Sequence, residues 1–351
     1  MIRADLTLVP DPTADPAESV PAPPAKRARA KTSQAKAPER QAFPPPAPVP
    51  AWARASGRAG QGDPLFAAGA GLALLDAHLR RDPPWAGALR SRLALMSTAA
   101  SAKIVRLNAD AAALRDLRFA AGEAAGRSAR LLRLWRELAG RPPSLDPGRI
   151  LAAAAALDLL TPNPNALAES LRERVRGGED PVSAAAKAAA SAFSAFPDAP
   201  AAEAEILALY AFDLALAIRL RWPRPLPLIA TKILDPTLRP PDAGRRPRPG
   251  DPAWPNAAAG AIALAAASAL DLAAHLSRRS TILLAVAPKL RAKASSKVVD
   301  MLLADDCLSS AAAARQAPMT DRAARRLFDR LVALGAVREL SGRPVFRLYG
   351  L

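Results

Sequence analysis

The chain has 351 residues, one cysteine and a formal net charge of +17. This length is enough for two or three domains, and a single cysteine excludes a scaffold of intrachain disulfides, which fits a reducing cytoplasm. The positive charge favours a polyanionic partner such as nucleic acid, although an Arg-rich, Ala-rich composition contributes to the same excess.

Residues 1–50 are rich in proline, lysine and arginine and hold too little apolar surface to offset the entropy of ordering. We predict a disordered tail, with a basic arm that adds non-specific phosphate contacts as the alternative. Asp5 and Pro10 interrupt the opening residues and no apolar core follows, so the segment does not have the pattern of a signal peptide.

Asp-Pro pairs recur along residues 51–294. Asp is a favoured helix N-cap, and Pro at the first helical position loses no hydrogen bond. The pairs are Asp63-Pro64, Asp82-Pro83, Asp146-Pro147, Asp180-Pro181, Asp235-Pro236 and Asp251-Pro252. We predict an all-α helical domain with helices over residues 64–81, 85–106, 110–121, 127–139, 147–160, 165–175, 182–196, 201–220, 226–234, 256–276 and 281–290.

Alanine and leucine dominate the predicted helices, so their burial is expected to hold the domain together. The larger core residues are predicted to be Phe66, Leu72, Leu75, Leu131, Leu134, Trp135, Leu138, Ile206, Leu209, Tyr210 and Ile218. The apolar segment 257–270 is too short to cross a membrane, so we predict a buried helix there and no membrane partner. The Pro-rich segment 221–255, with Arg245, Arg246 and Arg248, is predicted to be an exposed loop and a candidate neighbour of nucleic acid.

Few polar residues of the helical domain suggest chemistry. Acidic side chains interrupt apolar helices, and the two histidines, His78 and His275, occur in similar Leu-rich contexts. A metal site is one interpretation, and chance similarity with histidines favoured by the helix dipole is the other. The chain has no HExxH, CxxC or Gly-rich phosphate loop. We predict no enzyme, metal or cofactor, with metal-dependent activity in the helical domain as the alternative. The acidic residues are Asp76, Asp213, Asp271, Glu203 and Glu205.

Residues 295–351 predict three helices followed by a two-stranded hairpin, the order of a winged helix-turn-helix. The third helix is expected to begin at Thr320, an N-cap, and to end at Gly335. Its apolar stripe comprises Ala324, Leu327, Phe328, Leu331 and Leu334, and the strands are expected at 337–340 and 344–349. The Asp305-Asp306 pair is interpreted as a solvated turn, and Cys307 as a small core or surface residue.

The positive charge of this segment follows the two elements that would contact DNA. Residues 289–351 hold twelve Lys/Arg against six Asp/Glu. A helix fits the major groove, and arginine binds guanine edges or phosphate in a bidentate manner. The predicted groove residues are Arg322, Arg325, Arg326 and Arg330, with Thr320 at a phosphate by the helix N-terminus, and the predicted wing residues are Arg338, Arg343 and Arg347. The alternative is that these arginines form an ordinary solvated face and that the fold binds a protein instead of DNA.

Several stretches resemble an uncharacterised alphaproteobacterial, Rhizobium-type family known only as a domain of unknown function. The matching stretches are residues 66–76, 84–95, 113–116, 134–136, 283–293 and 338–349. The resemblance as a whole covers the chain from about Trp52 to its end. The chain departs at 120–128, where the family leads us to expect a Gly-Pro-rich connector. The closing Glu-Leu-Ser-Gly-Arg run is also similar to the end of rhizobial helix-turn-helix proteins. The resemblance implies a helical architecture and a bacterial cytoplasmic setting, and no activity.

The sequence therefore predicts a mainly α protein in three parts: a disordered tail (1–50), a helical domain (51–294) and a winged helix (295–351). The predicted function is that of a DNA-binding transcriptional or replicon-associated regulator, cytoplasmic and nucleoid-associated, with double-stranded DNA as its partner. The helical domain is expected to form a homodimer, sense a signal or recruit a protein partner. The alternative is a winged-helix docking module of a chromosome or plasmid maintenance assembly that does not read DNA.

Overall fold

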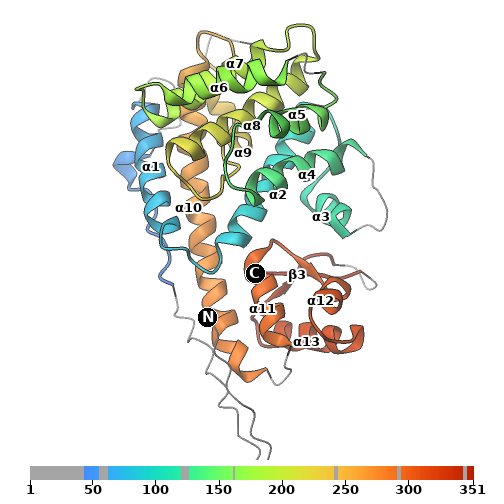
Figure 1. Ribbon diagram of the computed structural model, residues 1–351. Coiled ribbons are helices and arrows are strands. Elements are labelled where there is room, and N and C mark those ends of the chain that lie inside the picture. The colour runs from blue at the N-terminus through green and yellow to red at the C-terminus, as the bar shows by residue number, and fades with distance from the viewer. Residues whose placement is uncertain are drawn as a thin grey trace, which may run out of the picture. The chain divides into compact units, whose positions relative to one another are not determined.

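The computed structural model of the chain describes residues 43–54, 62–119, 126–160, 163–240, 244–290, 294–342 and 346–351. The predicted disordered tail lies mostly outside these residues. Residues 41–351 form one unit that includes both the helical body and the C-terminal segment. The structure is mainly helical and carries one small antiparallel sheet near the C-terminus, which confirms the predicted mainly α class (Figure 1).

Local capping explains where several helices of the body begin. Asp63, Asp146 and Asp180 accept backbone N–H bonds at the starts of α1, α5 and α7, and Asp235 does so at η2, as predicted. Asp82 and Asp251 do not cap a helix, so that prediction is wrong for them. The elements of the body are η1 (Ala51–Ala53), α1 (Pro64–Leu79), α2 (Ala86–Ile104), α3 (Ala111–Phe119), α4 (Arg127–Gly140), α5 (Pro147–Ala155), α6 (Pro164–Arg176), α7 (Pro181–Ser194), α8 (Ala201–Arg219), α9 (Ile229–Lys232), η2 (Pro236–Leu238), α10 (Trp254–Val286) and η3 (Ala287–Lys289).

The two failed caps have local causes. Asp82 has a left-handed φ of 46°, and α2 starts only at Ala86. The Asp251 carboxylate accepts the amide of Arg248 and pairs with Arg245, so it closes the preceding loop instead of capping α10.

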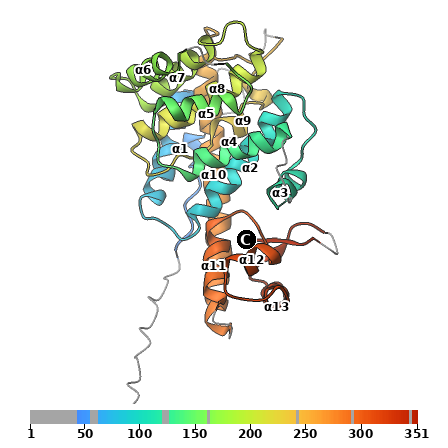
Figure 2. The same cartoon turned by 45° about the vertical axis from the view of Figure 1, so that its right-hand side comes forward.

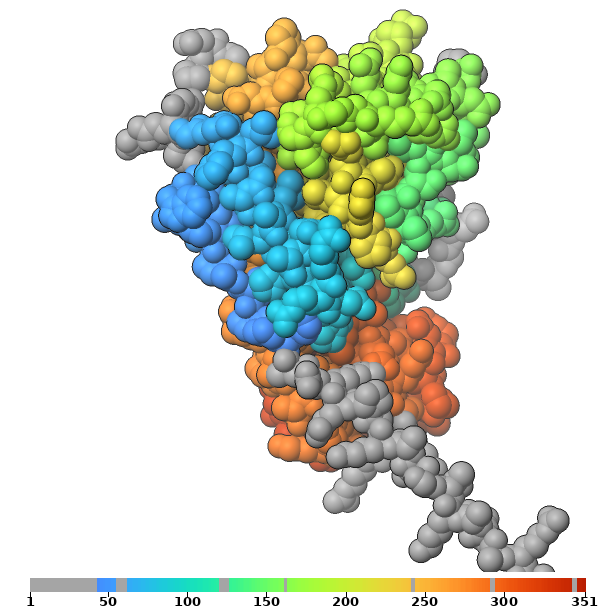
Figure 3. All heavy atoms as spheres, turned by 60° about the vertical axis from the view of Figure 1, so that its left-hand side comes forward, coloured from blue at the N-terminus to red at the C-terminus, as the bar shows by residue number. Residues whose placement is uncertain are grey.

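Helix α10 is one continuous helix of 33 residues, whereas the sequence pattern predicted two. No glycine or proline separates Leu276 from Thr281, and the hydroxyls of Ser280 and Thr281 donate to the carbonyl of Ser277 within the helix. In the space-filling view, α1 and the start of α2 cover the middle of α10 (Figure 3).

Helix α10, with η3, is also the element among the described residues that could cross a membrane by length and composition alone. The apolar helical stretch covers Trp254–Lys289, and its most apolar 18 residues have a mean hydropathy of 1.7. Of these most apolar residues, 67% are buried inside the protein. The core helix of a soluble protein can be as long and as apolar as a membrane span.

Small residues let the helices of the body approach closely. The position that a side chain would take at Gly71 of α1 lies 2.9 Å from Cβ of Ala266 in α10. The predicted core residues are buried, apart from Ile218, which is partly buried, and Phe66, which is 53% exposed. The prediction is wrong for Phe66 because this ring lies at the surface against exposed Trp52, with 6.1 Å between ring centroids.

In the described residues of the C-terminal segment, 294–342 and 346–351, there are three helices and three short strands. They are α11 (Ser295–Ala304), β1 (Leu308–Ser309), α12 (Ser310–Gln316), α13 (Asp321–Ala333), β2 (Arg338–Glu339) and β3 (Leu348–Gly350). The sheet order is β1-β3-β2, and both pairs are antiparallel. The predicted hairpin is present as β2 and β3, but β1 was not predicted because two buried residues show no alternation.

Helix α2 packs directly on α11, and this contact leads to a test. A Cβ at Gly87 would lie 2.7 Å from the Ala304 backbone. Gly87→Ala is therefore expected to lower the free energy of unfolding by about 1–3 kcal/mol through overpacking, in urea denaturation. This is the opposite of the usual effect, because alanine normally stabilises a helix interior relative to glycine by roughly 0.5–1 kcal/mol.

The matched control is Gly69→Ala in α1, where nothing lies within 4 Å of the added Cβ. This variant is expected to be more stable than the wild type. Equal stabilisation by both substitutions would show that α2 and α11 are not in tight contact.

Candidate nucleic-acid interface

Helix α13 forms as predicted, and its burial separates two faces. The Thr320 hydroxyl oxygen accepts the Ala323 amide at 3.2 Å and caps the helix, and Gly335 beyond its end has a φ of 66°. The apolar stripe is buried at Ala324, Leu327, Phe328 and Leu331. Leu334, predicted as part of the stripe, is 42% exposed because it lies at the C-cap, where the helix ends.

The stripe connects α13 to the sheet. The rings of Phe328 and Tyr349 stack with centroids 4.3 Å apart and planes 7° apart. Both residues are buried, so the stack fixes the position of β3 relative to the helix. The arginines of α13 therefore lie on a rigid support.

The opposite face of α13 carries the predicted arginines, and all four are exposed. Among the described residues, Arg322, Arg325 and Arg326 make no hydrogen bond or ion pair, and Arg330 donates from Nη2 to the Lys289 carbonyl at 3.4 Å. Exposed Thr320 lies at the N-terminus of the same helix. The first two turns of α13 thus present cationic groups to solvent.

The arginines of the sheet are less uniform. Arg338 of β2 is exposed. Arg347 has its Nη1 atom 3.8 Å from Asp329 and its Nε atom 3.8 Å from Glu339. A hydrogen bond with Tyr349 and the charge of Glu339 raise the pKa of Arg347. Part of its charge is therefore offset, and the predicted Arg343 lies outside the described residues.

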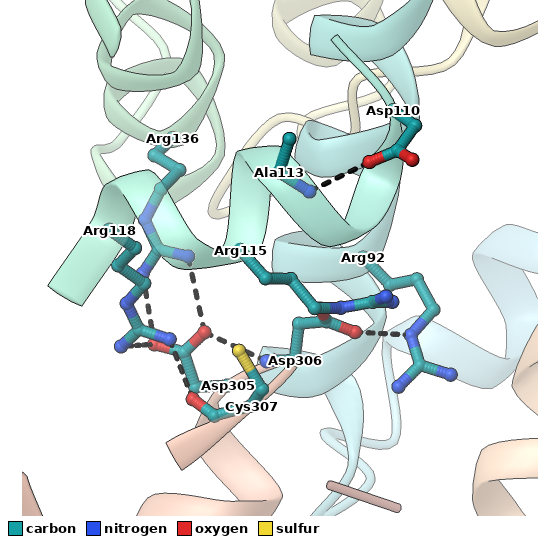
Figure 4. A network of polar contacts seen from close by, with 9 residues as sticks. All are labelled: Arg92, Asp110, Ala113, Arg115, Arg118, Arg136, Asp305, Asp306 and Cys307. Carbon is teal, nitrogen blue, oxygen red and sulfur yellow. Dashed lines mark hydrogen bonds and ion pairs between the residues drawn. The ribbon is translucent and has the colours of Figure 1, made fainter. Parts of the chain in front are cut away.

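Four arginines of the helical body converge on Asp305 and Asp306, and we call this network the arginine clamp (Figure 4). Asp306 accepts from Nε of Arg92 in α2 at 2.5 Å and from Nε of Arg115 in α3 at 2.6 Å. Asp305 pairs with Arg118 of α3 and accepts from Arg136 of α4 at 2.9 and 3.1 Å. The clamp joins the loop between α11 and β1 to three helices of the body.

The interpretation of Asp305-Asp306 as a solvated turn is wrong. Asp306 is 3% exposed, and its position is fixed by the bonds of the clamp. Burial raises the pKa of Asp306, but the charges and hydrogen bonds of Arg92 and Arg115 outweigh this and hold it below 3.8. The sequence contained one indication that the two acids lie near the core: they are followed directly by the apolar residues Cys307 and Leu308. Both of these residues are buried.

Cys307 is a free thiol in the core next to the clamp. Burial and the nearby Asp306 carboxylate raise its pKa to about 12, so it is protonated at neutral pH. An uncharged thiol is a poor nucleophile. The residue therefore packs as a small apolar side chain, as one of the two sequence-based interpretations expected.

The Pro-rich loop, predicted to be exposed and a neighbour of nucleic acid, has its three arginines beside acidic side chains. Arg246 is largely buried and pairs with Glu205, which is fully buried in α8, and the Nε atom of Arg248 lies 3.5 Å from the same carboxylate. Arg245 pairs with Asp251. Burial raises the pKa of Glu205 despite the nearby arginines. These ion pairs hold the loop against the body.

The other acidic residues of the body also have structural partners. Asp76 accepts from Arg80 and from the Trp222 indole, and Asp213 accepts the amides of Leu228 and Ile229. Burial raises the pKa of Asp213 well above its ordinary value, although these two amides lower it.

Among the described residues, the two histidines and the acidic residues of the body do not form a group that could hold a metal ion. The Leu74 carbonyl oxygen accepts a hydrogen bond from Nδ1 of His78 at 3.1 Å. Glu203 pairs with Arg127, and Asp271 is exposed on α10. In the part of the chain that the structure describes, no three His, Cys, Asp or Glu side chains gather as a metal site would require.

A family model described as "Protein of unknown function (DUF1403)" matches residues 38–351. The chain belongs to the DUF1403 family. The match covers the helical body and the C-terminal segment together. A comparison with curated proteins found no match.

The arginine clamp predicts an effect on stability. Asp306→Asn keeps the size of the side chain but leaves Arg92 and Arg115 without their counter-charge. The free energy of unfolding is expected to fall by about 3 kcal/mol at neutral pH, as for other broken buried pairs, in chemical denaturation. The stabilisation by Asp306 is present above its unfolded pKa of 3.8 and is lost as the pH falls through the lower folded pKa. The difference between wild type and variant should therefore shrink below about pH 4.

The matched control is Asp198→Asn, at an exposed turn residue of the body. It should alter stability by less than about 0.5 kcal/mol. A neutral effect of Asp306→Asn would mean that the clamp does not hold the C-terminal segment.

Proposed function

We propose that residues 295–351 are a winged helix-turn-helix that binds duplex DNA, with α13 in the major groove. On this proposal the protein acts as a transcriptional or replicon-associated regulator. The observation that carries it is the set of three exposed arginines on the first turns of α13 that have no acidic partner among the described residues.

The order of elements supports the winged-helix assignment. Helices α11, α12 and α13 precede the β2-β3 hairpin, and β1 lies between α11 and α12. Four residues, 317–320, separate α12 from α13, the length typical of a helix-turn-helix connection. In such motifs the N-terminal residues of the second helix contact base edges. Arg322, Arg325 and Arg326 occupy this part of α13.

The contrast with other arginines strengthens the assignment. In the helical body, guanidinium groups such as those of Arg92, Arg136 and Arg246 are bound by carboxylates. Arg322, Arg325 and Arg326 keep their donors available, although Asp321 and Asp329 lie on the same helix. Available, bidentate donors on a rigid helix are what guanine edges and phosphates require.

A second candidate function is protein docking through the same segment, without DNA. Val332 and Leu334, at the C-terminal end of α13, are 39% and 42% exposed and could contact a protein partner. The ion pairs of Arg347 also reduce the charge available on the wing. A pull-down from nuclease-treated lysate separates the two functions, because only docking persists without nucleic acid.

Charge reversal on α13 tests the DNA proposal. The double variant Arg325→Glu and Arg326→Glu is expected to bind duplex DNA about a hundredfold more weakly in a gel shift at physiological salt. The dependence of log affinity on log salt should also flatten by about one for each phosphate that the variant no longer binds. Circular dichroism should be unchanged, because both side chains are exposed.

The matched control is the double variant Arg133→Glu and Arg239→Glu, at two exposed positions of the helical body. It changes the net charge by the same amount and should retain most of the affinity. If the two double variants weaken DNA binding equally, the net charge of the protein and not the α13 face is responsible.

A further inference from the structure

A second cationic feature lies on α10, in the half of the helix that runs beside the C-terminal segment in both views (Figures 1 and 2). It consists of His275, Arg278 and Arg279 of α10 together with Arg338 of β2, and we call it the α10 cation cluster. Arg278 and Arg338 are exposed, whereas His275 and Arg279 are half-buried. The cluster is therefore open to solvent on one side and enclosed on the other.

Arg279 is the unusual member of this cluster. Its Nε and Nη2 atoms are buried, and neither has a hydrogen-bond acceptor among the described residues. Leaving a buried donor of a charged group unsatisfied costs more free energy than one ordinary hydrogen bond contributes. A side chain in this state is expected to have an acceptor from outside the chain.

Comparison with other arginines shows why Arg279 stands apart. Arg149 and Arg219 each also enclose one nitrogen without an acceptor. The rest of each group is bound, because Arg149 donates to the Tyr210 hydroxyl and Arg219 donates to the Gly177 carbonyl. Arg279 differs because two of its nitrogens are enclosed without an acceptor. In the part of the chain that the structure describes, no hydrogen bond holds its guanidinium group.

The surroundings of Arg279 have a single sign of charge. Burial and the charge of Arg338 lower the pKa of Arg279. Burial and then the charges of Arg92, Arg338, Arg278 and Arg279 lower the pKa of His275, and no carboxylate is among these causes. Asp306 binds Arg92 and Glu339 lies beside Arg347, whereas Asp271 is exposed on α10 one turn before His275. Three arginines and a histidine against this one carboxylate favour a multiply charged anion over a single carboxylate.

From this geometry we infer that the α10 cation cluster is a binding site for a phosphate-type oxyanion, with Arg279 as the principal donor. The two enclosed nitrogens of Arg279 provide the planar fork that suits two oxygens of one phosphate group. Arg338 contributes charge from the sheet, so the bound anion bridges α10 and β2. The anion is either a free phosphate or a phosphate of the DNA backbone, and the two sources share this chemistry.

The test uses the full chain, inorganic phosphate without DNA, and the two histidines as reporters. Phosphate replaces chloride at constant ionic strength, and the imidazole signals are followed by NMR. A bound anion stabilises the imidazolium, so phosphate should raise the pKa of His275. The chemical shift of His78, on α1, should not change when phosphate is added. Identical responses of both histidines, or none, would overturn the inference.

Two variants locate the site. Arg279→Met keeps an unbranched side chain but removes the charge, and Arg338→Met removes the exposed partner on β2. In wild type, saturating phosphate should raise the melting temperature by roughly 3 °C or more, and both variants should lose this increase. Arg133→Met, on α4, is the control and should keep it. Because Arg279→Met removes an unpaired buried charge, its melting temperature in chloride should not fall, and an equal phosphate effect in this variant excludes the site.

Duplex DNA then separates the two sources of phosphate. If Arg279→Met loses the phosphate response but binds DNA as wild type does, the ligand is a free phosphate. If this variant loses both, a backbone phosphate occupies the site. The phosphate measurements contain no DNA, so the inference can stand even if the α13 face does not bind DNA, and it can fail when that face does.

Discussion

The arginine clamp is the interaction on which the arrangement of this protein depends. Asp305 and Asp306 lie at the point where the C-terminal segment turns from α11 into β1, and three helices of the body supply their counter-charges. Burying two carboxylates is unfavourable unless their oxygens are bound, and here each carboxylate has two arginine partners. The clamp thereby fixes the loop next to β1, and β1 pairs with β3, which stacks on α13. The exposed face of α13 is held by this series of contacts.

Arginine has two different roles in this chain, and the presence or absence of a carboxylate partner distinguishes them. In the body, arginines join segments that are distant in sequence, as Arg246 joins the Pro-rich loop to Glu205 of α8. On α13 and at the α10 cation cluster, they are left without carboxylate partners among the described residues. Each of the ion pairs in the body sets one cation against one anion, so the net charge of +17 resides on Lys and Arg side chains beyond those pairs. Part of this excess lies on α13 and the α10 cation cluster, and part lies on exposed arginines of the body such as Arg133 and Arg239.

Helix α10 provides the frame for both regions. Its first half packs against α1 through small residues such as Ala266, which lies close to Gly71. Its second half carries His275 and Arg279 and leads through η3 into the C-terminal segment. This single helix of 33 residues thus runs from the body to a position beside the C-terminal segment, and no hinge interrupts the helix (Figures 1 and 2). This continuity and the clamp favour a fixed orientation of α13 relative to the body.

The sequence by itself determined the features that depend on neighbouring residues. Asp63, Asp146 and Asp180 cap helices because capping requires only the next three amides, and the stripe of α13 follows from its own periodicity. Only the tertiary structure decided the partners of Asp305 and Asp306, which lie 169 to 214 residues away and leave no periodic trace in the sequence. The same holds for the burial of Arg246 and for the unpaired nitrogens of Arg279. Whether an arginine faces solvent or a carboxylate is decided by packing between distant segments, because local spacing carries no information about it.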